Sequence, residues 1–270
     1  MRKLIGMMIA GSLLSVGQVA SAGPYEDGID AYKRADYVTA LNLLRPLAER
    51  GDAVAQYTVG IIYRDGKGVT QNLKEAMKWH RLSAEQGIRA AQFFVGEMYG
   101  DGKGVTQDYK EAVKWYRLSA EQGLPTAQNR LGLMYARGLG VAKDYKEAVR
   151  WHRLSAEQGF APAQDDLGEA YYDGRGVAQD YKEAVKWYRL AAEQNYPPAQ
   201  LSLGKSYRDG RGVAQDNVRA HMWLNLAAAS ESDWASFRDR LATKMPPTQI
   251  ERAQDMARKC QQSKFKDCGW

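Results

Sequence analysis

Ser202 and Lys205 are the residues whose types and spacing come closest to a known catalytic pattern. The Ser-x-x-Lys interval places a hydroxyl and an amine one helical turn apart, as penicillin-recognising serine enzymes require for their nucleophile. The companion motifs of those enzymes, Ser-Asp-Asn and Lys-Thr-Gly, do not occur in the sequence. Both residues also stand at positions that vary freely between repeats of the chain, so we attribute the spacing to chance and expect no catalytic residue.

Metal and phosphate chemistry are weakly indicated. His80, His152 and His221 lie far from one another and from the cysteines in sequence, without the ligand spacing of a zinc site. The string Gly100-Asp-Gly-Lys-Gly104 contains glycines of the kind found in phosphate-binding loops, but it follows a predicted helix and recurs along the chain as a turn. We therefore expect no metal and no other cofactor.

The first 22 residues have the three parts of an export signal. Arg2 and Lys3 precede an apolar run, and the small residues Ala20-Ser-Ala22 follow it. An uncleaved membrane anchor is the alternative, but the apolar stretch of roughly 13 residues is shorter than the ~20 that span a bilayer. We predict cleavage after Ala22, a periplasmic or secreted protein, and no membrane insertion after cleavage.

Cysteine content and charge indicate the environment and the partners. In an oxidising compartment Cys260 and Cys268, the only two cysteines, are expected to form a disulfide. The formal net charge is +6, and it falls to +4 when Arg2 and Lys3 are lost with the signal. This excess is too small to indicate a nucleic-acid partner.

A period of 36 residues organises most of the chain. The recurring residues are Gly60, Gly96, Gly132, Gly168 and Gly204; Tyr63, Tyr99, Tyr135, Tyr171 and Tyr207; and Trp79, Trp115, Trp151, Trp187 and Trp223. In each unit a first helix around the glycine is followed by a glycine-rich turn and by a second helix that opens with Asp or Asn and closes at Gly or Asn. A lone helical hairpin cannot bury its apolar face, whereas stacked neighbours can, so the period predicts a solenoid.

The segments that flank the repeats are predicted to close the array. Residues 23–51 form a shorter hairpin that keeps the register and lacks the turn, so we assign it as an N-terminal cap, followed by five repeats over 52–231. The last second helix becomes apolar at Val218, Met222 and Leu224, where earlier copies have charged or polar residues. Residues 232–270 are therefore assigned to a C-terminal helical cap that covers it.

Three motifs identify a resemblance to the Sel1-like repeats, relatives of the tetratricopeptide repeat. They are Ala-Gln-x-x-x-Gly-x-x-Tyr, Asp-Gly-x-Gly-Val and Glu-Ala-x-x-Trp-x-Arg-Leu-Ala-Ala-Glu-Gln, and the resemblance covers residues 52–231. It implies an all-α, right-handed α-solenoid with an inner groove that holds partner proteins. Cysteine-rich secreted members have been linked to penicillin binding, but those carry a cysteine pair in each repeat, and this chain does not.

The copies provide an internal alignment that separates packing positions from variable ones. On a helix with about 100° per residue, the constant positions, represented by Gly60 and Tyr63, fall on one arc of the first helix. The variable positions, represented by Tyr57 and Arg64, fall on the opposite arc. We predict that this variable arc faces the groove and binds the partner; a solvated face that drifts without function is the alternative.

The predicted partner-binding row runs from apolar through acidic to basic residues. It comprises Tyr57, Ile61, Arg64, Phe93, Phe94, Glu97, Asn129, Arg130, Leu133, Asp165, Asp166, Glu169, Tyr172, Lys205 and Arg208. Aromatic residues at its start would supply affinity, and charge would set the orientation of an extended peptide or a helix. For Phe93 and Phe94 the alternative is burial against the N-terminal cap.

These observations predict a non-enzymatic scaffold or adaptor of the bacterial cell envelope that binds a protein or peptide. Two alternatives remain. One is a secreted cell-wall or β-lactam-binding hydrolase that uses Ser202. The other is a purely structural spacer, for which the variable arc would have no partner.

Overall fold

The computed structural model describes residues 23–266 and 268, so the predicted signal peptide lies outside the described residues. This part of the chain contains 14 α-helices, one short 3-10 helix and no strand. The helices are α1 (Pro24–Lys33), α2 (Tyr37–Glu49), α3 (Ala53–Asp65), α4 (Leu73–Glu85), α5 (Arg89–Asp101), α6 (Tyr109–Glu121), α7 (Pro125–Arg137), α8 (Tyr145–Glu157), α9 (Ala161–Asp173), α10 (Tyr181–Ala192), α11 (Pro197–Asp209), α12 (Asn217–Ser230), α13 (Ala235–Ala242) and α14 (Pro247–Gln262), with the 3-10 helix at Ser232–Trp234. No helix among these residues is long and apolar enough to cross a membrane.

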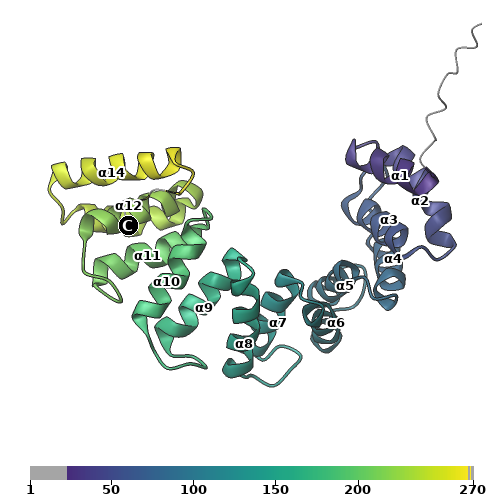
Figure 1. The fold of residues 1–270 in the computed structure, drawn as a ribbon, viewed down its shortest axis with the longest axis horizontal. Helices are drawn as coiled ribbons and strands as arrows, with labels where there is room; N and C mark the ends of the chain where they lie inside the picture. Colours follow the sequence, from purple (N-terminus) through teal and green to yellow (C-terminus); the bar gives the residue numbers. More distant parts are fainter. Residues whose placement is uncertain (1–22, 267, 269–270) are drawn as a thin grey trace, which may run out of the picture.

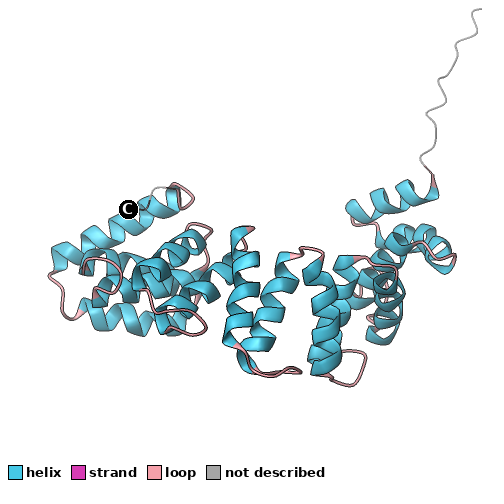
Figure 2. Cartoon of the chain, turned by 60° about the horizontal axis from the view of Figure 1, so that its bottom comes forward, coloured by secondary structure: helices cyan, strands magenta, loops and turns pink. Residues whose placement is uncertain are grey.

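The helices stack as consecutive hairpins into an open arc. Each helix contacts its neighbours in sequence, from α1 against α2 through to α11 against α12. Figure 1 shows that the ribbon bends so that the two ends of the array rise on the same side, and Figure 2 shows the helices joined by short loops. The all-α solenoid predicted from the period is confirmed.

Helix ends follow the capping signals of the sequence. The side chain of Asp108 accepts hydrogen bonds from the backbone N–H groups of Lys110 (2.8 Å) and Glu111 (3.1 Å) at the start of α6. The same pair of bonds starts α4, α8, α10 and α12. Helix α5 ends at Gly102, whose φ of 68° is left-handed. The glycine string of 100–104 is therefore a helix end and a turn, as predicted.

A buried glutamine in each of the first four repeats ties three helices together. Nε2 of Gln128 on α7 donates to the carbonyl of Ala120 on α6 at 3.1 Å, and its Oε1 accepts from Nε2 of Gln158 at 2.8 Å, just past the end of α8. Gln56 makes the same bonds, and its amide reaches Ala48 of α2. The N-terminal hairpin α1–α2 is thus attached to the first repeat by the same glutamine hydrogen bonds that join successive repeats.

The C-terminal helices cover the last repeat. Helices α13 and α14 both pack on α12, where Trp223 is fully buried. Leu226 of α12 is 3% exposed, whereas Leu190 at the same position of α10 is 44% exposed. Met222, which stands where α10 has the exposed Lys186, is also fully buried, so the expected cover over α12 is present.

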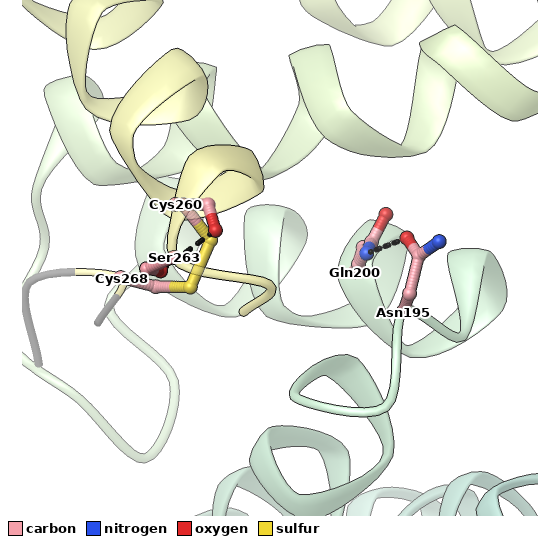
Figure 3. The surroundings of a disulfide bond; sticks show 5 residues. All are labelled: Asn195, Gln200, Cys260, Ser263 and Cys268. Atoms are coloured by element: carbon pink, nitrogen blue, oxygen red, sulfur yellow. Dashed lines mark hydrogen bonds between the residues drawn. A yellow bond between two sulfur atoms is a disulfide. The ribbon is translucent and has the colours of Figure 1, made fainter. Parts of the chain in front are cut away.

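A disulfide closes the end of the chain. Cys260 of α14 is bonded to Cys268, as expected, and both cysteines are buried. Beside it, the Ser263 hydroxyl donates to the Cys260 carbonyl at 2.8 Å (Figure 3). On a chain-entropy estimate, closing a loop this short contributes about 2 to 3 kcal/mol to the stability of the cap.

Candidate functional site

The constant glycine of each first helix makes room for a side chain of the second helix. A Cβ added to Gly132 would lie 2.7 Å from Cε1 of the His152 ring, and one added to Gly96 would lie 2.7 Å from the Tyr116 ring. The side chains that use this space in successive repeats are His80, Tyr116, His152, Tyr188 and Leu224. Because no methyl group intervenes, the two helices approach closely, and these side chains are buried against the first helix.

Hollows lie side by side along the first helices. The hollow between α7 and α9, of about 450 Å³, has His152, Asp166 and Glu169 in its lining. Its neighbour toward α11, of about 250 Å³, has Tyr188 in its lining. Ten residues of the predicted row line five such hollows, namely Arg64, Phe94, Glu97, Arg130, Leu133, Asp166, Glu169, Tyr172, Lys205 and Arg208. Together these hollows form the surface that we call the groove.

Asn129 and Asp165 are buried, so the prediction that packing leaves their positions free is wrong. They are only 5% and 7% exposed. The position they share in the repeat lies at the edge of the variable arc, where it contacts the following repeat instead of solvent. Phe93 at this position packs on the core that is built around Leu131 of the next repeat. Thr58 from the variable arc is likewise buried.

An aromatic group forms at the start of the groove from Tyr57, His80, Phe93 and Phe94. The Phe94 ring stacks on those of His80 and Tyr57, with centroid distances of 5.2 Å and 6.0 Å. Cζ of Arg64 lies 4.1 Å above the same ring, a cation–π contact. Phe93 instead turns toward Tyr116 of its own repeat, 5.9 Å away.

The aromatic group does not pack on the N-terminal cap. The core that contains Leu41 and Leu44 of α2 includes neither Phe93 nor Phe94. Phe94 remains half-buried and lines a hollow together with Arg64. Burial against the cap is therefore not the reason for these two phenylalanines, and one of them is available at the groove surface.

An acidic group, made of Asp165, Asp166 and Glu169, follows on α9. Burial raises the pKa of all three carboxyl groups, and it raises the pKa of Asp165 to about 8 with help from the charges of Glu169 and Asp166. Oδ1 of Asp165 has no hydrogen-bond partner within the described residues. The amide of Asn129 donates to Oδ2 of Asp166 at 2.6 Å.

His152 completes this region as a neutral side chain. Burial lowers its pKa to about 4, so the imidazole is uncharged near neutral pH. Nδ1 of the ring lies 3.1 Å from the Asn129 amide nitrogen, which also donates a hydrogen bond to Asp166. The buried asparagine therefore holds both a histidine and an acid of the groove, and it positions them without reaching the surface itself.

The basic end of the groove combines α11 with the C-terminal cap. Arg208 is paired with Asp209 through two contacts of 2.7 Å and 2.9 Å. Nζ of Lys205 lies 4.8 Å from the centre of the Phe237 ring, which comes from α13. The repeat alignment could not reveal Phe237, because residues 232–270 lie outside the 36-residue period.

Ser202 and Lys205 both line the hollow beside Tyr188. No hydrogen bond joins Ser202 Oγ to Lys205 Nζ among the described side chains. Lys205 lies against Phe237 instead. In residues 23–266 and 268, no group of three or more His, Cys, Asp or Glu side chains is arranged to hold a metal ion.

The stacked hairpins and their shared groove define a helical repeat protein of the α-solenoid class. The Sel1 repeat model matches residues 18–52, 53–88, 89–124, 125–160, 161–196 and 197–232, and the chain belongs to the Sel1 repeat family. The first matched segment contains the hairpin that we assign as the N-terminal cap. No curated protein matches the chain.

Two solved structures are similar over most of the chain. One is c5321, a protective antigen present in uropathogenic Escherichia coli strains that displays an SLR fold, with 32% identity and a TM-score of 0.84 over 90% of this chain. The other is a Sel1 repeat protein from Oxalobacter formigenes, with 33% identity and a TM-score of 0.78 over 87% of this chain. The matches span 54% of the E. coli chain and 97% of the Oxalobacter chain.

Proposed function

We propose that the chain is a non-enzymatic scaffold of the bacterial cell envelope that binds a protein or peptide in the groove. The observation that carries this proposal is the aromatic group, in which Phe94 is held at the groove surface by stacking on His80 and Tyr57. Aromatic side chains fixed in this way are frequent hot spots of protein interfaces, because little conformational entropy is lost when a partner covers them.

The charge order along the groove supports an oriented partner. Helix α9 contributes acids and the neighbouring first helix α11 contributes Lys205 and Arg208, so successive parts of a bound segment meet different electrostatic environments. The export-like segment 1–22 and the Cys260–Cys268 disulfide support a location in an oxidising compartment such as the periplasm.

The test compares partner capture by matched variants. Phe94→Ser removes an aromatic anchor from the groove, while Leu118→Ser removes an exposed apolar side chain, 45% accessible, from the second helix α6. We expect crosslinking in the periplasm, followed by purification of the full chain, to recover one or more proteins with wild type. Recovery should fall about tenfold or more with Phe94→Ser, the loss typical of a hot spot, and stay unchanged with Leu118→Ser.

Equal recovery by wild type and Phe94→Ser would overturn the proposal and favour the spacer alternative. Circular dichroism of both variants provides the folding control, because each removes an apolar side chain from a helix surface. Hydrolysis of nitrocefin by wild type that is lost in Ser202→Ala would instead favour the hydrolase.

A further inference from the structure

The C-terminal cap forms a hollow of its own with the last repeat. This cap hollow measures about 470 Å³ and lies where α13 meets α11 and the start of α12. Its lining residues are Arg208, Asp209, Gln215, Asn217, Phe237, Arg240, Leu241 and Lys244. Half of them come from residues 237–244, which the repeat pattern does not include. The cap therefore does more than cover α12, because it adds a wall to the groove.

The cap hollow carries an uncompensated positive charge. Arg240 and Lys244 are exposed, and neither makes an ion pair or a side-chain hydrogen bond within the described residues. The one acid in the lining, Asp209, is already engaged by the guanidinium of Arg208. Two cations thus face a concave surface without a counter-charge, and Phe237 and Leu241 add apolar contacts beside them.

Most arginines elsewhere in the groove lie beside an acid, and Arg137, which makes no ion pair within the described residues, lines the same hollow as Asp166 and Glu169. Arg130 reaches Glu97 at 3.4 Å, and Arg175 reaches Asp173 at 2.8 Å. Arg64 pairs with Asp65 at 2.7 Å. The cap hollow differs in that, among the described side chains, its lining holds two unpaired cations and no free acid. An anion bound there would gain attraction without displacing an existing acid.

The cap hollow continues the groove. Phe237 lines it, and Nζ of Lys205, which lines the neighbouring hollow on the α9 side, lies 4.8 Å from the centre of the Phe237 ring. A segment that lies along α9 and α11 would extend onto α13. The concave shape and the presence of only two unpaired cations fit a peptide better than a duplex or a membrane surface, which require broad arrays of positive charge.

We propose that the cap hollow binds a carboxylate-bearing segment of the partner, with an apolar side chain next to the acids that packs on Phe237. This inference rests on the proposed function, because it assigns chemistry to one end of the same bound partner. It also sets the orientation of that partner, with its acidic segment at the C-terminal cap. The carboxylates are those of acidic side chains, because the lining presents two cations; a free C-terminal carboxylate is the other source of this chemistry, and the experiment separates the two.

The test uses defined peptides and the full chain. The probe is a fluorescein-labelled Glu-Glu-Phe-Glu-Glu-Leu peptide, prepared with an amidated and with a free C-terminus, and the control probe replaces each Glu by Lys. Fluorescence anisotropy at low ionic strength measures the dissociation constant. We expect both acidic peptides to bind wild type and the lysine peptide to bind much more weakly. Tighter binding of the free-acid form would identify the terminal carboxylate as the preferred source.

Charge reversal at the hollow gives the decisive comparison. Arg240→Glu/Lys244→Glu should weaken binding of the acidic peptides about tenfold or more, and Arg240→Gln/Lys244→Gln should weaken it less. Arg252→Glu/Lys264→Glu changes the net charge equally at exposed cap residues outside the hollow, so it should leave most of the affinity. Circular dichroism of all three variants checks that each keeps its helices.

Two results would overturn the inference. One is equal binding of the acidic peptides by wild type and Arg240→Glu/Lys244→Glu, and the other is equal binding of the acidic and lysine peptides by wild type. Phe94→Ser separates this test from that of the proposed function, because Phe94 lies in a different hollow. Partner capture that survives Phe94→Ser, together with peptide binding that depends on Arg240 and Lys244, would reject the aromatic anchor and keep the cap hollow.

Discussion

The imidazole ring of His152 lies so close to Gly132 that a methyl group on this glycine would come within 2.7 Å of Cε1. The contact places a ring from a second helix beside the hollow that Asp166 also lines. The constant glycine leaves the space that the ring occupies. Packing at a constant position therefore determines where a side chain that lines the groove lies.

Gly132→Ala is expected to destabilise the protein even though alanine is the better helix former. The added methyl group must displace the His152 ring, and overpacking of this kind costs about 1 to 3 kcal/mol, more than the gain of roughly 1 kcal/mol in helix propensity. Gly100→Ala is the matched control in α5, because its nearest neighbour would be the Tyr116 hydroxyl at 3.4 Å. Urea unfolding should show a loss for Gly132→Ala and no loss for Gly100→Ala, and equal effects would contradict the close contact.

Ionisation of the buried Asp165 carboxyl group is expected to lower the stability of the protein as the pH rises. Burial raises its folded pKa from 3.8 to about 8, so between these values the folded state holds a proton that the unfolded state releases. The free energy of unfolding therefore falls with increasing pH across this window. Asp166 and Glu169 act in the same direction, while His152, with its pKa lowered to about 4, acts in the opposite direction below about pH 6.5.

Asp165→Asn should remove the largest of these effects. Its gain in stability over wild type should be greater at pH 8 than at pH 5, by on the order of 3 kcal/mol. Thermal or urea unfolding at the two pH values measures this difference, with Asp173→Asn as a control at the exposed end of α9. A gain that does not depend on pH would show that Asp165 is charged in the folded protein.

Ser230→Gln is expected to stabilise the last repeat. Gln200 occupies the position of Gln164, but its Oε1 is buried without a hydrogen-bond partner, whereas that of Gln164 accepts from Gln194. The residue 36 positions after Gln194 is Ser230, which is too short to make this bond. Supplying the amide should add about 1 kcal/mol to the free energy of unfolding. Ser230→Ala should not, and the same gain with alanine would exclude the hydrogen bond as the cause.

Much of the fold could be predicted from the sequence because the repeated units can be aligned with one another. Positions that stay constant, such as Gly60 and Tyr63, must serve contacts that every unit makes. Residues that begin and end helices, such as Asp108 and Gly102, act through bonds to nearby backbone groups. Helix ends can therefore be predicted from a short stretch of sequence.

The sequence by itself determined the period, the helix ends, the packed arc and the need for a cover over α12. Only the tertiary structure decided that Asn129 and Asp165 are buried between repeats and that Phe237, Arg240 and Lys244 of the cap share a hollow with Arg208. Helical periodicity predicts the direction in which a side chain projects from the axis of its helix. Whether that direction meets solvent, a groove or the next repeat depends on how successive hairpins are rotated and where a non-repeating segment folds back, and these are set by packing between residues distant in sequence.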